Sequence, residues 1–146
     1  ALMITTIVAV LGTLAGSAIA HLSQRSQLRI ADGRARRSER LAAVEALATA
    51  LADHRRAMWV REDLRLRGED WAAARAESHN TRSAITAPLL RVQLLLPDVA
   101  TTAQDAARAA YELRNADDEI ALTESREHAI QQADRFVTTA GVAVAT

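Results

Sequence analysis

Residues 38–67, SERLAAVEALATALADHRRAMWVREDLRLR, decide the fold class of this chain. Apolar side chains recur along the stretch at alternating steps of three and four, which is the spacing of one face of an α-helix. The stretch contains neither Gly nor Pro, and Gly68 follows it directly. We therefore predict a single helix that ends near Arg67, with Gly68 as its terminating residue.

The sequence after Gly68 predicts three further helices. Asp70 is a candidate N-cap for a helix that begins at Trp71, and Pro88 inside this helix predicts a kink. Turn signals then separate a third helix from a fourth. We place the third helix at about residues 99–114, the fourth at about 119–140, and a frayed or partner-covered tail at 138–146. The expected fold class is all-α, with an antiparallel helical hairpin or bundle of about four helices.

A short turn at Gly68 also predicts which residues of the first two helices face each other. In an antiparallel pair, facing residues have numbers with a constant sum, here about 136, because neighbouring helices joined by a short loop run antiparallel. Leu51 should then face Ile85, and Val44 should face Val92. The predicted hairpin core consists of Leu41, Val44, Ala48, Leu51, Met58, Ile85, Leu89 and Val92.

The N-terminal run 1–20, ALMITTIVAVLGTLAGSAIA, contains no charged residue and no Pro. Twenty helical residues span about 30 Å, the thickness of a bilayer core, so we predict a transmembrane helix over residues 1–22. A secretory signal peptide is one alternative, because Ala18-Ile19-Ala20 fits a small-x-small cleavage pattern, although no basic region precedes it. A buried helix of a soluble protein is the other.

A basic juxtamembrane segment, residues 23–40, follows the apolar run. Positive charge beside a span is retained on the cytoplasmic side, so we expect the N-terminus outside and a helical domain, residues 41–146, in the cytoplasm. The arginines of the segment should contact anionic lipid headgroups, and a nucleic-acid-binding arm is the alternative. They are Arg25, Arg29, Arg34, Arg36, Arg37 and Arg40.

Small residues within the apolar run predict self-association. Gly12 and Gly16 form a GxxxG step that Ala20 continues on the same helix face. Small residues allow two helix backbones to approach closely within a membrane. We therefore expect a homo-oligomer assembled through this face, through the cytoplasmic part, or through both.

Charge and residue types limit the chemistry that the chain can perform. Residues 21–67 carry a net charge of +5 and residues 68–146 a net charge of −5, so the two parts complement each other and nucleic acid is an unlikely partner. The chain has no Cys, no two of its four histidines have a metal-ligand spacing, and it has no glycine-rich phosphate loop. We expect no enzyme activity, no metal and no cofactor. His54-Arg55-Arg56 with Trp59 leaves open an anion-binding or base-stacking role.

The stretches ITTIVAVLGTLAGS, RSERLAAVEALATALADHRRAMWVREDLRL and TRSAITAPLLRVQLLL, in this order, resemble short actinobacterial proteins of the KilB-like plasmid transfer or spread family. The resemblance covers most of the chain. It implies a membrane-associated role in the spread of mobile DNA and assigns no role to a single residue.

Together these features predict a membrane-anchored, self-associating helical protein with a structural or assembly role, an accessory in the spread of mobile DNA. Its expected partners are membrane lipids, further copies of the chain, and other membrane or transfer proteins. The alternative is a membrane-tethered helical sensor or binding module for a ligand or a partner protein.

Overall fold

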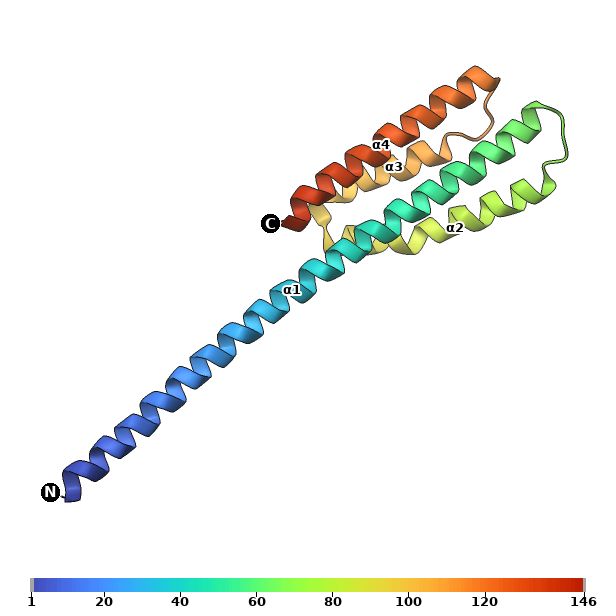
Figure 1. Cartoon of the computed structure of the whole chain (residues 1–146). Helices are drawn as coiled ribbons and strands as arrows, with labels where there is room; N and C mark the ends of the chain where they lie inside the picture. The colour runs from blue at the N-terminus through green and yellow to red at the C-terminus, as the bar shows by residue number, and fades with distance from the viewer. Residues whose placement is uncertain (1, 146) are drawn as a thin grey trace. The chain divides into compact units, whose positions relative to one another are not determined.

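The computed structural model describes residues 2–145, with side chains from Ile19 onward. Every regular element in this range is helical, and no strand occurs in it, which confirms the predicted all-α class. The elements are α1 (Leu2–Leu66), α2 (Ala72–Leu95), the short 3₁₀ helix η1 (Pro97–Val99), α3 (Ala100–Tyr111) and α4 (Glu119–Ala145) (Figure 1).

The chain divides into two units, residues 1–38 and 39–146. The first unit contains the N-terminal part of α1, whose described side chains, residues 19–38, are all exposed. Within the described part of the chain, no helix is both long and apolar enough to cross a membrane. The predicted span over residues 1–22 falls mostly on residues 1–18, and these, with Gly12 and Gly16, lie outside the described side chains.

The second unit is a four-helix bundle built from the C-terminal part of α1 and from α2, α3 and α4. Consecutive helices alternate in direction along the chain (Figure 1). Helix α3 packs along α4 and also contacts α2, while η1 makes the short connection between α2 and α3. The bundle of about four helices predicted for residues 41–146 is therefore present.

The turn between α1 and α2 and the turn between α3 and α4 each contain a residue with positive φ and an aspartate that accepts a backbone hydrogen bond. Gly68, at φ 70°, adopts the left-handed conformation that glycine tolerates best, and α1 ends two residues before it. Trp71, and not the predicted Asp70, is the N-cap residue of α2, which begins one residue later than predicted, and a carboxylate oxygen of Asp70 accepts the backbone N–H of Ala72 at 3.0 Å. At the other turn Asn115 has φ 61°, and Asp118 accepts the N–H of Ala121 at 2.8 Å to cap α4.

The core of the bundle forms two clusters of buried apolar residues. The larger cluster fills the bundle toward η1, and the smaller one lies nearer to the turns at Gly68 and Asn115. Five of the eight predicted core residues are buried, namely Val44, Leu51, Met58, Ile85 and Val92. Ala48 and Leu89 are partly buried and pack against the larger cluster.

Leu41 is the core prediction that is wrong, because its side chain is 49% exposed. From Val44 the pattern allows a step of three or of four, and the prediction takes Ala48 where the helix buries Leu47. This choice rotates the predicted face by about 100° at that step. The face that is actually buried therefore begins at Ala43 and Val44, and Leu41 lies beside it in solvent.

Contacts between α1 and α2 lie close to the predicted antiparallel register in the half of the hairpin near Gly68, whereas toward η1 Arg91 pairs with Glu39, six residues from that register. His54 contacts Thr81, and Arg61 contacts Ser78. Both pairs lie within three residues of the predicted register. The turn at Gly68 is short, so α1 and α2 can shift along each other by only a few residues.

The tail predicted as frayed or partner-covered, residues 138–146, is instead helical through Ala145. Ala140 is completely buried, and Ala143 and Val144 pack against the larger core cluster. Packing of these small apolar residues against the core stabilises the last turns of α4.

Candidate functional site

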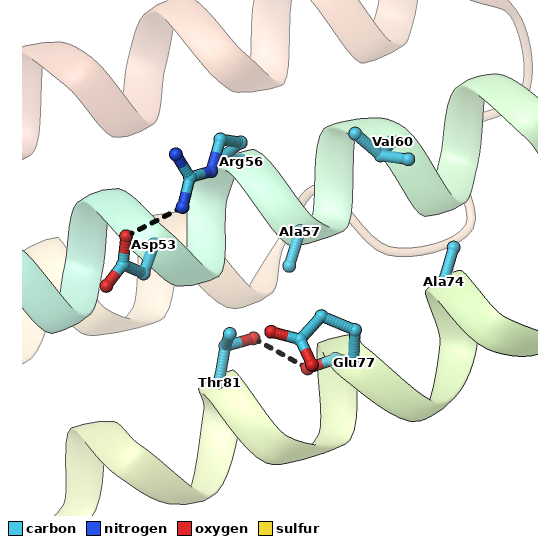
Figure 2. A pocket seen from close by; sticks show the side chains of 7 residues that line it. All are labelled: Asp53, Arg56, Ala57, Val60, Ala74, Glu77 and Thr81. Atoms are coloured by element: carbon cyan, nitrogen blue, oxygen red, sulfur yellow. Dashed lines mark hydrogen bonds and ion pairs between the residues drawn. The ribbon is translucent and has the colours of Figure 1, made fainter.

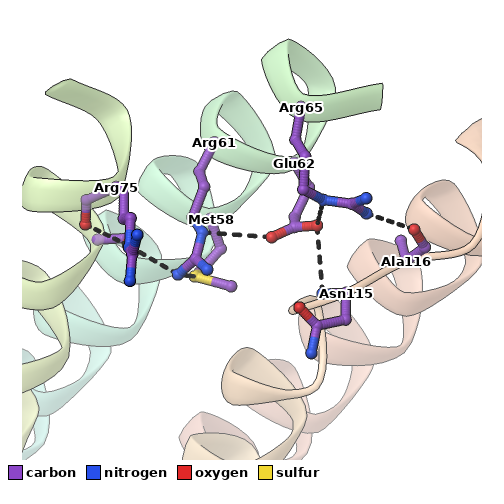
Figure 3. Close-up of polar contacts among 8 residues, drawn as sticks. Met58, Arg61, Glu62, Arg65, Arg75, Asn115 and Ala116 are labelled. Atoms are coloured by element: carbon purple, nitrogen blue, oxygen red, sulfur yellow. Dashed lines mark hydrogen bonds and ion pairs between the residues drawn. The ribbon is translucent and has the colours of Figure 1, made fainter. Parts of the chain in front are cut away.

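Glu62 occupies the most buried charged position of the bundle, with no solvent-exposed surface. Its Oε2 atom accepts hydrogen bonds from Arg65 Nε at 2.7 Å and from the backbone N–H of Asn115 at 3.2 Å (Figure 3). Arg65 also donates to the backbone carbonyl of Ala116. The carboxylate thus ties α1 to the turn between α3 and α4.

Arg61 neutralises Glu62 from the other side and reaches α2. Its Nε atom lies 3.3 Å from Glu62 Oε1, and one terminal nitrogen donates to Ser78 Oγ at 3.1 Å. Ser78 in turn donates to the carbonyl of Arg75 at 2.7 Å (Figure 3). The guanidinium also lies 5.4 Å from the centroid of the Trp71 ring, on the face of the indole, where a cation is attracted.

The pKa of Arg61 is lowered by burial and by the positive charges of Arg114, Arg75 and Arg65, against the opposite effect of the Glu62 carboxylate. Arg61 Nε and Glu62 Oε1 form an ion pair and have no hydrogen-bond partner among the described residues. Atoms of α1, α2 and the turn before α4 therefore meet in one polar cluster, formed by Arg61, Glu62, Arg65, Ser78 and the backbone of residues 115–116. We interpret this cluster as a structural device that fixes the two helical hairpins in one arrangement, as buried polar networks do when their groups are paired.

His54 is a second buried polar side chain, in the middle of the bundle. Its Nδ1 atom is 2.9 Å from Thr81 Oγ1, and its ring meets the Tyr111 ring edge-on at 5.5 Å between centroids. Burial, together with the positive charges of Arg82 and Arg61, lowers the pKa of His54 to about 4. The imidazole is therefore neutral at pH 7, and its Nε2 atom has no hydrogen-bond partner among the described residues.

An open groove of about 350 Å³ lies between α1 and α2, on the outer side of this hairpin. Its walls carry the small side chains of Ala57 and Ala74 and the carboxylates of Asp53 and Glu77 (Figure 2). Asp53 is paired with Arg56 at 3.1 Å. Thr81 also lines the groove, and its hydroxyl donates to the backbone carbonyl of Glu77 at 3.1 Å.

The predicted headgroup-binding arginines lie on a helical surface. Arg25, Arg29, Arg34, Arg36 and Arg37 are exposed, and Arg40 is half-buried. None of the six has an acidic ion-pair partner within residues 19–145. Ala20, the described member of the predicted association face, is exposed as well. In the same range, no group of three or more acidic, histidine or cysteine side chains is arranged to hold a metal ion.

Sequence reasoning missed the polar cluster around Glu62. A signal for it was present, because Arg61 and Glu62 lie about one turn after Met58 and about two turns after His54, on the buried face of α1. Continuing that face by steps of three and four would have placed a charged pair in the core. Charged residues at such positions are seldom buried unless they are paired, so they predict a network.

Fold and polar contacts together define a small all-helical bundle protein, with an exposed basic helical segment before the bundle and a buried ionic cluster that joins its hairpins. Residues 41–144 match the protein family described as "KilB plasmid transfer protein". The chain belongs to this family. It is 55% identical to "Protein KilB" of Streptomyces lividans over 141 residues, which cover 94% of this chain and 96% of that protein. No solved structure matches the chain.

Proposed function

We propose that the chain is a membrane-anchored, self-associating assembly protein that serves as an accessory in the spread of plasmid DNA. Membership of the KilB plasmid transfer family supports the process. The observation that carries the anchoring is the abrupt change at Ala20, from twenty uncharged residues to a helical segment rich in exposed and unpaired arginines. An apolar run supplies the span, and the arginines retain the bundle on the cytoplasmic side.

The arginines also fit a lipid surface better than a protein core. Five of them are exposed, and each is attracted to an anionic membrane surface by about 1 kcal/mol when it lies within a Debye length. Contact with headgroups gives these unpaired cations a counter-charge. Residues 68–146, with a net charge of −5, are repelled by the same surface.

Self-association would turn a small anchored bundle into a larger assembly. The GxxxG step Gly12–Gly16 provides a face on which two spans pack closely, and the opposite charges of residues 21–67 and 68–146 provide a second contact between copies. An assembly role needs no catalytic residues. It requires only that several copies be held together at the membrane.

The test is the mass of the full chain in a mild detergent, measured by light scattering after size exclusion. We expect an oligomer, and we expect Gly12→Ile with Gly16→Ile to lower the oligomer fraction because the larger side chains keep the backbones apart. Ala15→Ile with Ala18→Ile is the matched control, because these two small residues lie about 100° and 160° around the helix from Gly16. A monomer at every protein concentration would overturn self-association, and extraction of the protein from membranes by alkaline carbonate would overturn anchoring.

A further inference from the structure

A pocket of about 300 Å³ lies between α1 and α4, next to the groove of Figure 2, with which it shares Asp53 and Arg56. Its lining joins residues that the sequence places far apart, because Trp59 belongs to α1 and Arg126 to α4. The guanidinium carbon of Arg126 lies 5.2 Å from the centroid of the Trp59 ring. The full lining consists of Ala52, Asp53, Arg55, Arg56, Trp59 and Arg126.

The charges in this pocket are unbalanced. The carboxylate of Asp53 is paired with Arg56 at 3.1 Å, which leaves Arg55 and Arg126 as cations. Neither of these two arginines has a carboxylate within ion-pair distance among the described residues. Burial and the positive charge of Arg126 both lower the pKa of Arg55, against a smaller opposite effect of Asp134.

Two guanidinium groups held close together beside an aromatic ring are well suited to a phosphate group attached to a planar ring system. Arginine presents a fork of N–H donors that matches the oxygens of phosphate, and its flat face stacks on aromatic rings. Trp59 is half-buried and Arg126 lies over its ring, so a base would stack on the part of the indole that Arg126 leaves open. A base stacked on a tryptophan adds binding free energy whatever its identity, because every base has a π face.

The size and setting of the pocket favour a single nucleotide over a strand. A volume of about 300 Å³ is at the small end of the range for ligand sites. Asp53 lies in the pocket and is paired with Arg56, Asp134 lies near Arg55, and the chain from residue 68 onward is acidic, so a long polyanion would meet repulsion around the pocket.

We propose that the pocket between α1 and α4 binds a nucleoside monophosphate, with Arg55 and Arg126 holding the phosphate and Trp59 stacking against the base. The ligand supplies the negative charge that the two arginines lack. Binding would also join α1 to α4, so it would stabilise the bundle. This role goes beyond assembly at the membrane, and it depends on neither anchoring nor self-association.

The chain has two tryptophans, so Trp71→Phe leaves Trp59 as the only indole reporter, while the phenyl ring keeps a face for Arg61 and Arg75. In this full-length background, purified in detergent, we expect AMP to quench Trp59 fluorescence with a saturable dependence on concentration. Arg55→Gln and Arg126→Gln should each weaken the binding about ten- to a hundredfold, because each removes a charge-assisted contact to phosphate. Arg108→Gln is the matched control, since Arg108 lies on α3 and is paired with Asp105.

Further ligands separate the phosphate contribution from the stacking contribution. Inorganic phosphate should compete with AMP, and adenosine should bind much more weakly than AMP. Adenosine binding as tightly as AMP would overturn the role of the arginines, and no saturation up to about 10 mM AMP would overturn the site. A short single-stranded oligonucleotide that binds more tightly than AMP would overturn the mononucleotide assignment. Thermal unfolding followed by circular dichroism confirms that each variant is folded.

Discussion

At the scale of single residues, Glu62 is the side chain on which the polar cluster depends. We expect Glu62→Ala to lower the free energy of unfolding by about 3–5 kcal/mol, because it leaves the buried Arg61 without its counter-ion. It also removes the acceptor for Arg65 and for the N–H of Asn115. Urea denaturation of the full chain in detergent measures the change.

The matched control for Glu62 is Asp105→Ala, which breaks the exposed ion pair with Arg108 on α3. Exposed pairs contribute about 0–1 kcal/mol, so this variant should unfold close to the original midpoint. Equal effects of the two substitutions would contradict a central role for the buried cluster.

His54 predicts how stability changes with pH. Its pKa is about 4 in the folded chain and 6.5 when exposed, so between these values the unfolded state binds a proton that the folded state does not. Stability should therefore decrease as the pH falls from about 6.5 toward about 4. His54→Gln should flatten this part of the profile, whereas replacing the exposed His79 by Gln should leave it unchanged. The measurement is the denaturant midpoint between pH 7 and pH 4. If His54→Gln lost as much stability over this range as the original chain, His54 would not be the cause of the pH dependence.

At the scale of elements, the positions of the helices could be read from the sequence, because their ends depend on local chemistry. Gly68, Asp70 and Asp118 act within one or two residues of the helix ends that they determine. The exact face of α1 could not be read in the same way. Leu47 and Ala48 are adjacent and both apolar, and only the positions of α2, α3 and α4 decide which one is enclosed.

The candidate sites were harder to predict for a related reason. Arg55, Arg56 and Trp59 are close in sequence and could be singled out together. Arg126 is on α4, and nothing in its local sequence indicates that it lies over the Trp59 ring. The contact of Glu62 with the backbone of Asn115 likewise joins residues 53 positions apart. Pairings of this kind arise from tertiary packing, which local patterns do not contain.

Two glycines of the bundle should respond in opposite ways to the same substitution. Gly68 has φ 70°, a conformation that costs an L residue about 1–2 kcal/mol, so Gly68→Ala should destabilise the bundle by about that amount. Gly141 lies inside α4, and Gly141→Ala should stabilise it by about 0.5–1 kcal/mol. A new Cβ meets no atom within 4 Å at either position, so sterics do not complicate the comparison. Thermal unfolding measures both, and a stabilised Gly68→Ala would contradict the assigned turn.

At the scale of the whole molecule, charge is separated along the chain. An uncharged run over residues 1–20 is followed by a basic stretch over residues 21–67 and by an acidic stretch from residue 68 onward. Ion pairs between the two stretches include Arg67 with Glu69, and also Arg91 of the acidic stretch with Glu39 of the basic stretch. The arginines before Glu39 find no acidic partner among the described residues, so their counter-charge must come from outside this set of contacts.

Topology at the membrane gives the last prediction, and the absence of cysteine from the chain makes it simple to test. If the arginines keep the bundle in the cytoplasm, a cysteine introduced at Leu2 of the full chain should react with a membrane-impermeant thiol reagent added to intact cells, and one at Asp117 should not. Asp117 is exposed on the bundle, so protection there reports the membrane and not burial within the fold. Both cysteines should react once the membrane is dissolved in detergent. Labelling at Asp117 and not at Leu2 in intact cells would reverse the orientation, because it would place the bundle outside.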